Sequence, residues 1–151
     1  MNNIIIDNIE VKIMTLDDLE TIKDILDSDF DEFWNYNVFK EELQSGNSKY
    51  LVAKFNNEII GFAGIKIIID EADIMNIVTK KIYRNQGVGT LLLSQIIDLC
   101  EELNLISISL EVNEINSSAI HLYENFNFKI TGNRKNYYNG SNAILMTKVL
   151  Y

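Results

Sequence analysis

The sequence predicts an α/β fold in which helices pack against one mixed sheet. Segments rich in β-branched residues alternate along the chain with segments whose apolar residues recur at helical spacing. Two asparagine-containing dipeptides, Asn56-Asn57 and Asn139-Gly140, separate neighbouring strand segments, as is typical of hairpins. The chain has 151 residues, so a single domain spanning 1–151 accounts for its whole length.

The first third of the chain predicts one strand and two helices. Residues 4–14 are rich in β-branched residues and predict a strand. Thr15 is a suitable N-cap for a first helix that we expect to run to about Ser28. An acidic and aromatic loop follows at 29–35, and residues 38–44 predict a short second helix.

The rest of the chain alternates between strands and two further helices. The long segment from Gly87 to Leu103 carries one apolar stripe at helical spacing and predicts an amphipathic helix. The expected order is β-α-α-β-β-β-α-β-α-β-β, with seven strands and four helices. The remaining predicted strands are 50–55, 58–69, 72–79, 106–112, 128–134 and 143–150, and the last helix is 116–126.

Charge is distributed unevenly along the chain. The formal net charge is −9, which argues against direct binding to nucleic acid, because lysine and arginine drive phosphate binding. Twelve acidic and three basic residues lie before residue 46, so the first third of the chain holds the whole excess of negative charge. This acidic surface is either a solvated face that keeps the protein soluble or a surface that attracts a cationic substrate.

The counts of cysteine and histidine exclude several kinds of site. A single cysteine, Cys100, cannot form an intramolecular disulfide, which suits a reducing cytoplasm. One cysteine and one histidine, His121, cannot supply the usual zinc ligands, so we expect no metal. The N-terminus lacks the pattern of a signal peptide, and the longest apolar run, 59–65, is far shorter than a membrane span. The sequence therefore predicts a cytoplasmic protein without a membrane partner.

A glycine-containing segment, 83–91, lies between a strand that ends near Thr79 and the long helix. Gly87 and Gly89 would let an anion approach the free N–H groups and the positive dipole of a helix N-terminus. Lys80, Lys81 and Arg84 lie beside them. The spacing fits neither a P-loop nor the dinucleotide fingerprint. Taken alone, the two glycines are equally compatible with a simple tight turn at a helix start.

The segment Arg-x-x-Gly-x-Gly at 84–89, in this order of strands, resembles the acetyl-CoA signature of the GNAT N-acetyltransferases. The resemblance covers nearly the whole chain. Residues 110–124 and 133–138 are similar to the RimI-type branch, which acetylates the N-terminal alanine of ribosomal proteins. The chain departs from that pattern at Asn127, where glycine is usual, at Asn113, where arginine is common, and at Ser141-Asn142, where the family has an acidic pair.

The resemblance implies a fold and a co-substrate. The strands at 72–79 and 106–113 would splay apart and hold acetyl-CoA in the gap between them, with no metal involved. The strand backbone at Ile77, Val78 and Thr79 would hold the pantetheine arm, and Asn116 would lie near its reactive end. The pyrophosphate would lie against Arg84, Asn85, Gln86, Gly87, Val88, Gly89 and Thr90.

The resemblance also implies catalytic and substrate-binding residues. Glu111 matches the general base that deprotonates the acceptor amine, and Tyr123 matches the acid that protonates the thiolate. A backbone N–H in the splayed strand would stabilise the oxyanion that develops during transfer. The implied substrate-binding residues are Trp34, Glu71, Tyr137 and Tyr138. On the residues alone, Glu111 and Glu71 could equally be strand-end acids, and the tyrosines could be packing residues.

Three functions follow from this pattern. The first is acetyl-CoA-dependent acetylation of the N-terminal amine, expected to be alanine, of a ribosomal protein or another basic peptide. The second is acetylation of a small amine or polyamine by the same fold. The third is a catalytically silent module that binds acyl-CoA, which the presence of Glu111 and Tyr123 argues against. The sequence leaves the oligomeric state open.

Overall fold

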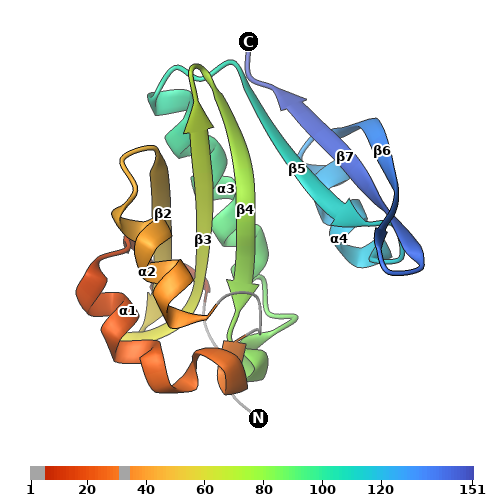
Figure 1. Ribbon diagram of the computed structural model, residues 1–151. Helices are drawn as coiled ribbons and strands as arrows, with labels where there is room; N and C mark the ends of the chain where they lie inside the picture. The colour runs from red at the N-terminus through yellow and green to blue at the C-terminus, as the bar shows by residue number, and fades with distance from the viewer. Residues whose placement is uncertain (1–5, 31–34) are drawn as a thin grey trace.

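The computed structural model describes residues 6–30 and 35–151. Its centre is a seven-stranded sheet with the order β1-β2-β3-β4-β5-β7-β6 (Figure 1). Neighbouring strands are antiparallel except β4 and β5, which are parallel. The strands are β1 Ile9–Ile13, β2 Ser48–Phe55, β3 Glu58–Ile68, β4 Glu71–Thr79, β5 Ser107–Asn113, β6 Lys129–Tyr138 and β7 Ser141–Val149; the α-helices are α1 Leu16–Ile22, α2 Tyr36–Gln44, α3 Val88–Glu102 and α4 Ser117–Asn125.

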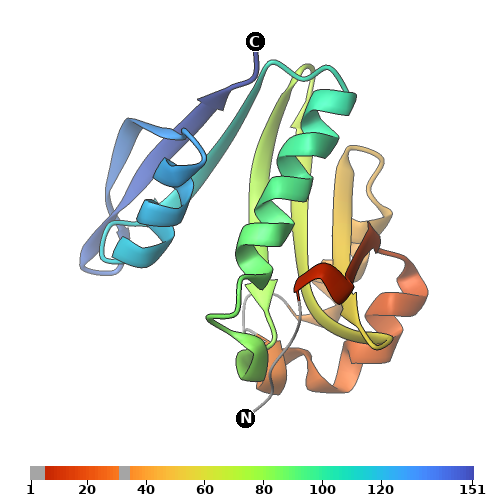
Figure 2. The same cartoon turned by 180° about the vertical axis from the view of Figure 1, so that it is seen from behind.

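The helices cover the two faces of the sheet. α1 and α2 pack in front of β2 and β3 in Figure 1, whereas α3 and α4 lie on the opposite face, seen from behind in Figure 2. Strand β2 illustrates the two sides, because Tyr50 and Val52 pack with α1 and α2, while Leu51 and Ala53 pack with α3. The predicted α/β fold with four helices and one mixed sheet is thus confirmed.

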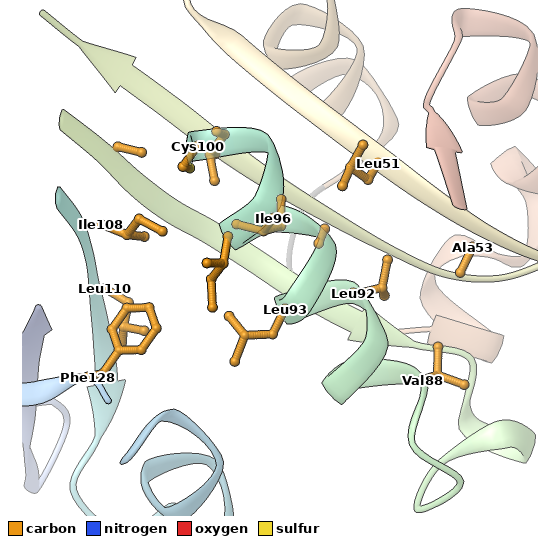
Figure 3. Close-up of a cluster of buried hydrophobic side chains, with 14 of the residues drawn as sticks. Leu51, Ala53, Val88, Leu92, Leu93, Ile96, Cys100, Ile108, Leu110 and Phe128 are labelled. Carbon is orange, nitrogen blue, oxygen red and sulfur yellow. The ribbon is translucent and has the colours of Figure 1, made fainter. Parts of the chain in front are cut away.

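The apolar stripe of α3 forms the larger core. Val88, Leu92, Ile96 and Cys100 recur every four residues and are almost completely buried (Figure 3). They pack with sheet residues such as Ile108 in one cluster. The smaller cluster on the other face contains a tilted pair of aromatic rings, Phe30 and Phe62, with centroids 5.5 Å apart. Both faces of the sheet at β2 and β3 are therefore covered by helices.

The sheet opens at its centre, as the family resemblance implies. The ladder between β4 and β5 pairs only Glu71–Asp73 with Ser107–Ser109, and the two strands then diverge (Figure 1). Next to the opening, β3 pairs Gly64 with Asn76 and the following Ile65 with Ile74, so Met75 is an extra, bulged residue of β4. A bulge bends and twists its strand, which helps β4 turn away from β5.

Two N-terminal elements differ from the prediction. The first strand was expected over 4–14, but β1 starts at Ile9 after a 3₁₀ turn, because Ile9 already pairs with Phe55, the last residue of β2. The first helix was expected to reach Ser28, but α1 ends at Ile22 and continues as a 3₁₀ turn and a π turn, Leu26–Phe30. This change of pitch keeps Ile22, Leu26 and Phe30 buried in one cluster.

The last hairpin is longer than predicted. The sixth strand was expected to end at Arg134, but β6 continues to Tyr138, which pairs with Ser141 across the predicted Asn139-Gly140 turn. The ladder is broken between Arg134 and Tyr138, and that irregularity obscured the strand in the sequence pattern. Asn127 has φ 67°, so asparagine supplies the left-handed conformation where the family usually has glycine.

Several acids of the first third pair with lysines of the sheet. Asp18 lies 2.8 Å from Lys54, and Glu42 lies 3.7 Å from Lys66. These lysines neutralise part of the acidic surface, and attraction of a cationic substrate by the remainder stays a prediction. Within 6–30 and 35–151, no helix is both long and apolar enough to cross a membrane. The boundaries of the single domain, 1–151, likewise stay a prediction.

Candidate active site

The first pocket, of about 310 Å³, lies where β4 ends and α3 begins. It brings together nine of the eleven residues predicted to bind the co-substrate, along with Leu122 of α4. Gln86 and Asn116 are the two predicted residues outside its lining. The lining residues are Ile77, Val78, Thr79, Arg84, Asn85, Gly87, Val88, Gly89, Thr90 and Leu122.

The start of α3 presents backbone donors to this pocket. Gly87 caps the helix with φ 89°, a left-handed conformation that a residue with a side chain rarely adopts. The first intrahelical bond runs from Leu91 N–H to the Gly87 carbonyl at 3.0 Å, so the preceding N–H groups have no helical acceptor. A Cβ added at Gly89 would meet only Thr79 Oγ1, at 4.0 Å, another lining atom. The helix start therefore suits close approach of a phosphate group.

The basic residues beside the glycines have different environments. Arg84 lines the first pocket, and its Nη2 donates to the Phe30 carbonyl at 3.1 Å. Lys80 points elsewhere, since its ammonium lies 2.9 Å from Glu58 and 3.8 Å from Asp29. Arg84 is thus the cation placed at the first pocket, and Lys80 joins β4 to the acidic first third.

The second pocket, of about 420 Å³, lies at the opening between β4 and β5. It contains three predicted residues, Glu111, Tyr137 and Tyr138. Glu71 lies outside this lining, and Asp73, on the same face of β4, lies within it. The period of two along β4 was the signal that could have identified Asp73. The lining residues are Asp73, Ile74, Met75, Ser109, Leu110, Glu111, Tyr137, Tyr138 and Leu145.

Glu111 and Tyr123 lie on opposite faces of β5. Leu110 and Val112 are buried toward α3 and α4, so strand alternation turns Glu111 to the other face. Tyr123, on α4, packs on the buried face, with its ring 5.8 Å from that of Phe128. The carboxylate of Glu111 and the phenol of Tyr123 therefore flank β5 from its two faces.

The phenol of Tyr123 is protonated at neutral pH. Burial raises its pKa above the ordinary value of a tyrosine, and the nearby Tyr138 raises it further. Tyr123 lines neither pocket directly, but its neighbour Leu122 lines the first. Asn116 caps α4, because its side-chain oxygen accepts from the Ala119 N–H at 3.2 Å.

Arg134 is a site residue that the sequence interpretation missed. Its Nη2 lies 3.2 Å from Oε1 of Glu111, which is only 27% exposed. The guanidinium also lies over the ring of Tyr137, 5.6 Å from its centroid. The segment 133–138 was identified as part of the family pattern, but it was expected to leave the sheet at Arg134, so no contact with β5 was predicted.

Two further expectations from the sequence concern Trp34 and metal binding. Trp34 falls outside the described residues. Among the residues that the structure describes, no group of three or more histidine, cysteine or carboxylate side chains is arranged to hold a metal ion. The roles assigned to Glu111, Tyr123 and the other site residues stay predictions, although the two pockets bring most of them together.

Comparisons with known proteins agree with this arrangement. Residues 19–128 match the Acetyltransferase (GNAT) family. A Bacillus subtilis protein named as a candidate ribosomal protein bS18-alanine N-acetyltransferase is 37% identical over 139 residues, covering 90% of this chain and 92% of its own length. The crystal structure of the ribosomal-protein-S18-alanine N-acetyltransferase from Escherichia coli superposes with a TM-score of 0.85 and 28% identity, covering 93% of each chain.

A fourth comparison is with a structure that contains the co-substrate. The structure of a GNAT family acetyltransferase from Elizabethkingia anophelis with acetyl-CoA bound has the same fold, with a TM-score of 0.74 and 24% identity over 95% of this chain and 99% of that one. The opened sheet, the glycine-containing start of α3 and these matches lead to one assignment. This chain is an acetyltransferase that belongs to the GNAT family.

Proposed function

We propose that this protein transfers the acetyl group of acetyl-CoA to the N-terminal α-amine of a ribosomal protein, with alanine as the first residue. The observation that carries the proposal is the opening between β4 and β5, which is flanked by a pocket suited to an anion and a pocket that contains Glu111. The relatives named for acetylation of the alanine of bS18 supply the substrate class. A cytoplasmic location fits such a substrate.

The first pocket suits acetyl-CoA. The free N–H groups at the start of α3 and the guanidinium of Arg84 would hold the pyrophosphate, and the edge of β4 at Ile77–Thr79 would pair with the pantetheine amides. The bound thioester supplies the acetyl group as an electrophile. The bulge at Met75 lies in the lining of the second pocket, where a backbone N–H of β4 would stabilise the negative charge that develops on the acetyl oxygen.

The second pocket suits a protonated amine. An α-amino group has a pKa near 8, so most of it is protonated at pH 7 and has no lone pair for attack. Glu111 would take the first proton, after which nitrogen bonds to the acetyl carbon and the bond from carbon to sulfur breaks. Tyr123 would donate its proton to the departing thiolate, and the second proton lost by nitrogen returns to solvent or to Tyr123. The carboxylates of Asp73 and Glu111 give the pocket the charge that attracts an ammonium group.

The test is direct acetylation of peptides. A peptide that starts with alanine and carries a basic sequence should be acetylated on its α-amine. Each turnover should release one molecule of coenzyme A, which is detected as a free thiol. The same peptide with a blocked N-terminus but a free lysine is the matched control, and it should not react. Acetylation of the lysine alone would overturn the assignment to N-terminal amines.

A small polyamine is a second candidate acceptor. Asp73 and Glu111 line one pocket, and two carboxylates could bind two ammonium groups. Spermidine therefore belongs in the same assay as the alanine peptide. Turnover of spermidine without turnover of the peptide would replace the proposed acceptor but would leave the acetyl-transfer chemistry unchanged.

A further inference from the structure

The guanidinium of Arg134 forms an ion pair with the carboxylate of Glu111. The two side chains form an ion pair of 3.2 Å at the second pocket, where Glu111 is half-buried and Arg134 is 56% exposed. Arg134 also contacts Tyr137, whose ring packs edge-on against that of Tyr138 at 5.0 Å. Both tyrosines line the second pocket, so the guanidinium is held at its rim by an anion and an aromatic face.

The local backbone builds this position. After the pair of Arg134 with Ala143, three residues of β6, 135–137, lie opposite the single residue Asn142 before Tyr138 pairs with Ser141. Asn136 has φ 55°, and its N–H donates to the side-chain oxygen of Asn142 at 2.9 Å. Irregularities of this kind redirect side chains beside active sites. The ion pair therefore belongs to the folded architecture of the hairpin.

The ion pair conflicts with the role of Glu111 as a base. An arginine side chain stays charged at any pH at which the protein is folded, so the guanidinium competes with any other cation for contact with the Glu111 carboxylate. The other ionisable groups at this pocket are Asp73 of β4 and the phenols of Tyr137 and Tyr138, while the residue of β7 opposite Glu111 is the uncharged Leu145. Arg134 is thus the cation that competes with the acceptor ammonium for contact with Glu111.

We propose that Arg134 is a placeholder, meaning that its guanidinium lies where the acceptor ammonium binds until the acceptor displaces it. This displacement sets the selectivity for peptides over minimal amines, which are acceptors that offer little beyond the amine itself. An ammonium group that replaces the guanidinium at Glu111 leaves the net charge of the pocket unchanged. The exposed guanidinium can swing into solvent at little desolvation cost and remain near Tyr137. A peptide acceptor gains contacts beyond its amine that offset the loss of the ion pair, whereas a minimal amine gains none. This inference rests on the proposed function and defines how its acceptor is selected.

The test compares two acceptors in three variants. The acceptors are a six-residue peptide that begins with alanine and the single-residue analogue alaninamide. Arg134→Gln removes the competing cation, Arg134→Lys keeps a cation at the same place, and Lys135→Gln removes an exposed charge from the next position. The expected result is that Arg134→Gln lowers the KM of alaninamide about two- to fivefold, and that of the peptide by less, since an ion pair of this exposure is worth about fivefold at most.

The other two variants show whether the effect depends on a positive charge at position 134 or on any positive charge nearby. Arg134→Lys should retain most of the wild-type ratio between the two KM values, and Lys135→Gln should leave that ratio unchanged. KM for acetyl-CoA should stay constant throughout. A higher KM for both acceptors in Arg134→Gln, or equal changes in Arg134→Gln and Lys135→Gln, overturns the placeholder role. If the wild type acetylates neither acceptor, the proposed function fails first, and the inference fails with it.

Discussion

The hydroxyl of Ser141 donates a hydrogen bond of 2.9 Å to the side-chain oxygen of Asn113. Both residues depart from the pattern of the family that the sequence resembles, and the bond joins the end of β5 to the start of β7. Asn142, a further departure, accepts from the Asn136 N–H at 2.9 Å through its side-chain oxygen, and its own N–H donates to Glu114. The three residues thus make polar contacts at the end of the strand that carries Glu111.

We predict that Asn113 and Ser141 are energetically coupled. Asn113→Ala and Ser141→Ala should each lower the free energy of unfolding by about 1 kcal/mol, the usual net value of a hydrogen bond, and the double variant should cost less than their sum. Urea denaturation of the four proteins measures the coupling. Strict additivity of the two single effects would mean that the hydrogen bond contributes nothing.

The catalytic assignment predicts two variants with intact binding and slow turnover. Glu111→Gln and Tyr123→Phe should each lower kcat about 100-fold or more, because each removes a proton-transfer group. Binding of acetyl-CoA, measured by calorimetry, should not change. Glu124→Gln is the matched control, since it removes an exposed carboxylate from the residue next to Tyr123 on α4. Full turnover in either catalytic variant would show that the residue has been assigned the wrong role.

The start of α3 predicts a separation between stability and binding. Gly89→Ala should fold at least as stably as the wild type, because alanine favours helices and its Cβ meets only Thr79 Oγ1 at 4.0 Å. That Cβ would nevertheless enter the first pocket, and the loss of one charge-assisted hydrogen bond should weaken acetyl-CoA binding about 10- to 100-fold. Calorimetry and thermal denaturation measure the two effects.

Two other glycines provide the controls for this experiment. Gly87→Ala should destabilise the protein by about 1–2 kcal/mol, because φ 89° is unfavourable for any residue with a Cβ. Gly46→Ala, at a position where a Cβ meets no atom within 4 Å, should change neither stability nor binding appreciably. Unchanged acetyl-CoA affinity in Gly89→Ala would argue against a phosphate site at this helix start.

The single cysteine should be inert in the folded protein. Burial, together with a smaller contribution from the nearby Glu101, raises the pKa of the Cys100 thiol to about 11. At pH 8 only about one molecule in a thousand then carries the reactive thiolate. A disulfide reagent should therefore label Cys100 only after unfolding in urea. Rapid labelling of the native protein would contradict its position in the core.

The sequence predicted the regular elements well because their signals are local. The apolar stripe of α3, the hairpin turns and the alternation of β5 are all readable from neighbouring residues, and the residues of the first pocket follow each other closely along the chain. The contact between Glu111 and Arg134 could not be predicted in this way. It depends on β7, which pairs with both β5 and β6, and on the irregular pairing of β6 with β7 beyond Arg134. The same holds for Ser141 and Asn113, which meet only through the register of β5 and β7.

Acetylation of a peptide that begins with alanine is the decisive measurement for the proposed activity. The protein is incubated with acetyl-CoA and either the alanine peptide or spermidine, thiol release is followed, and the modified atom is located by tandem mass spectrometry. The buried Cys100 should add no background to the thiol signal. We expect acetyl transfer to the α-amine of the alanine peptide and a large loss of that activity in Glu111→Gln. Acetylation of spermidine alone, or of the peptide at an equal rate in Glu111→Gln, would contradict it.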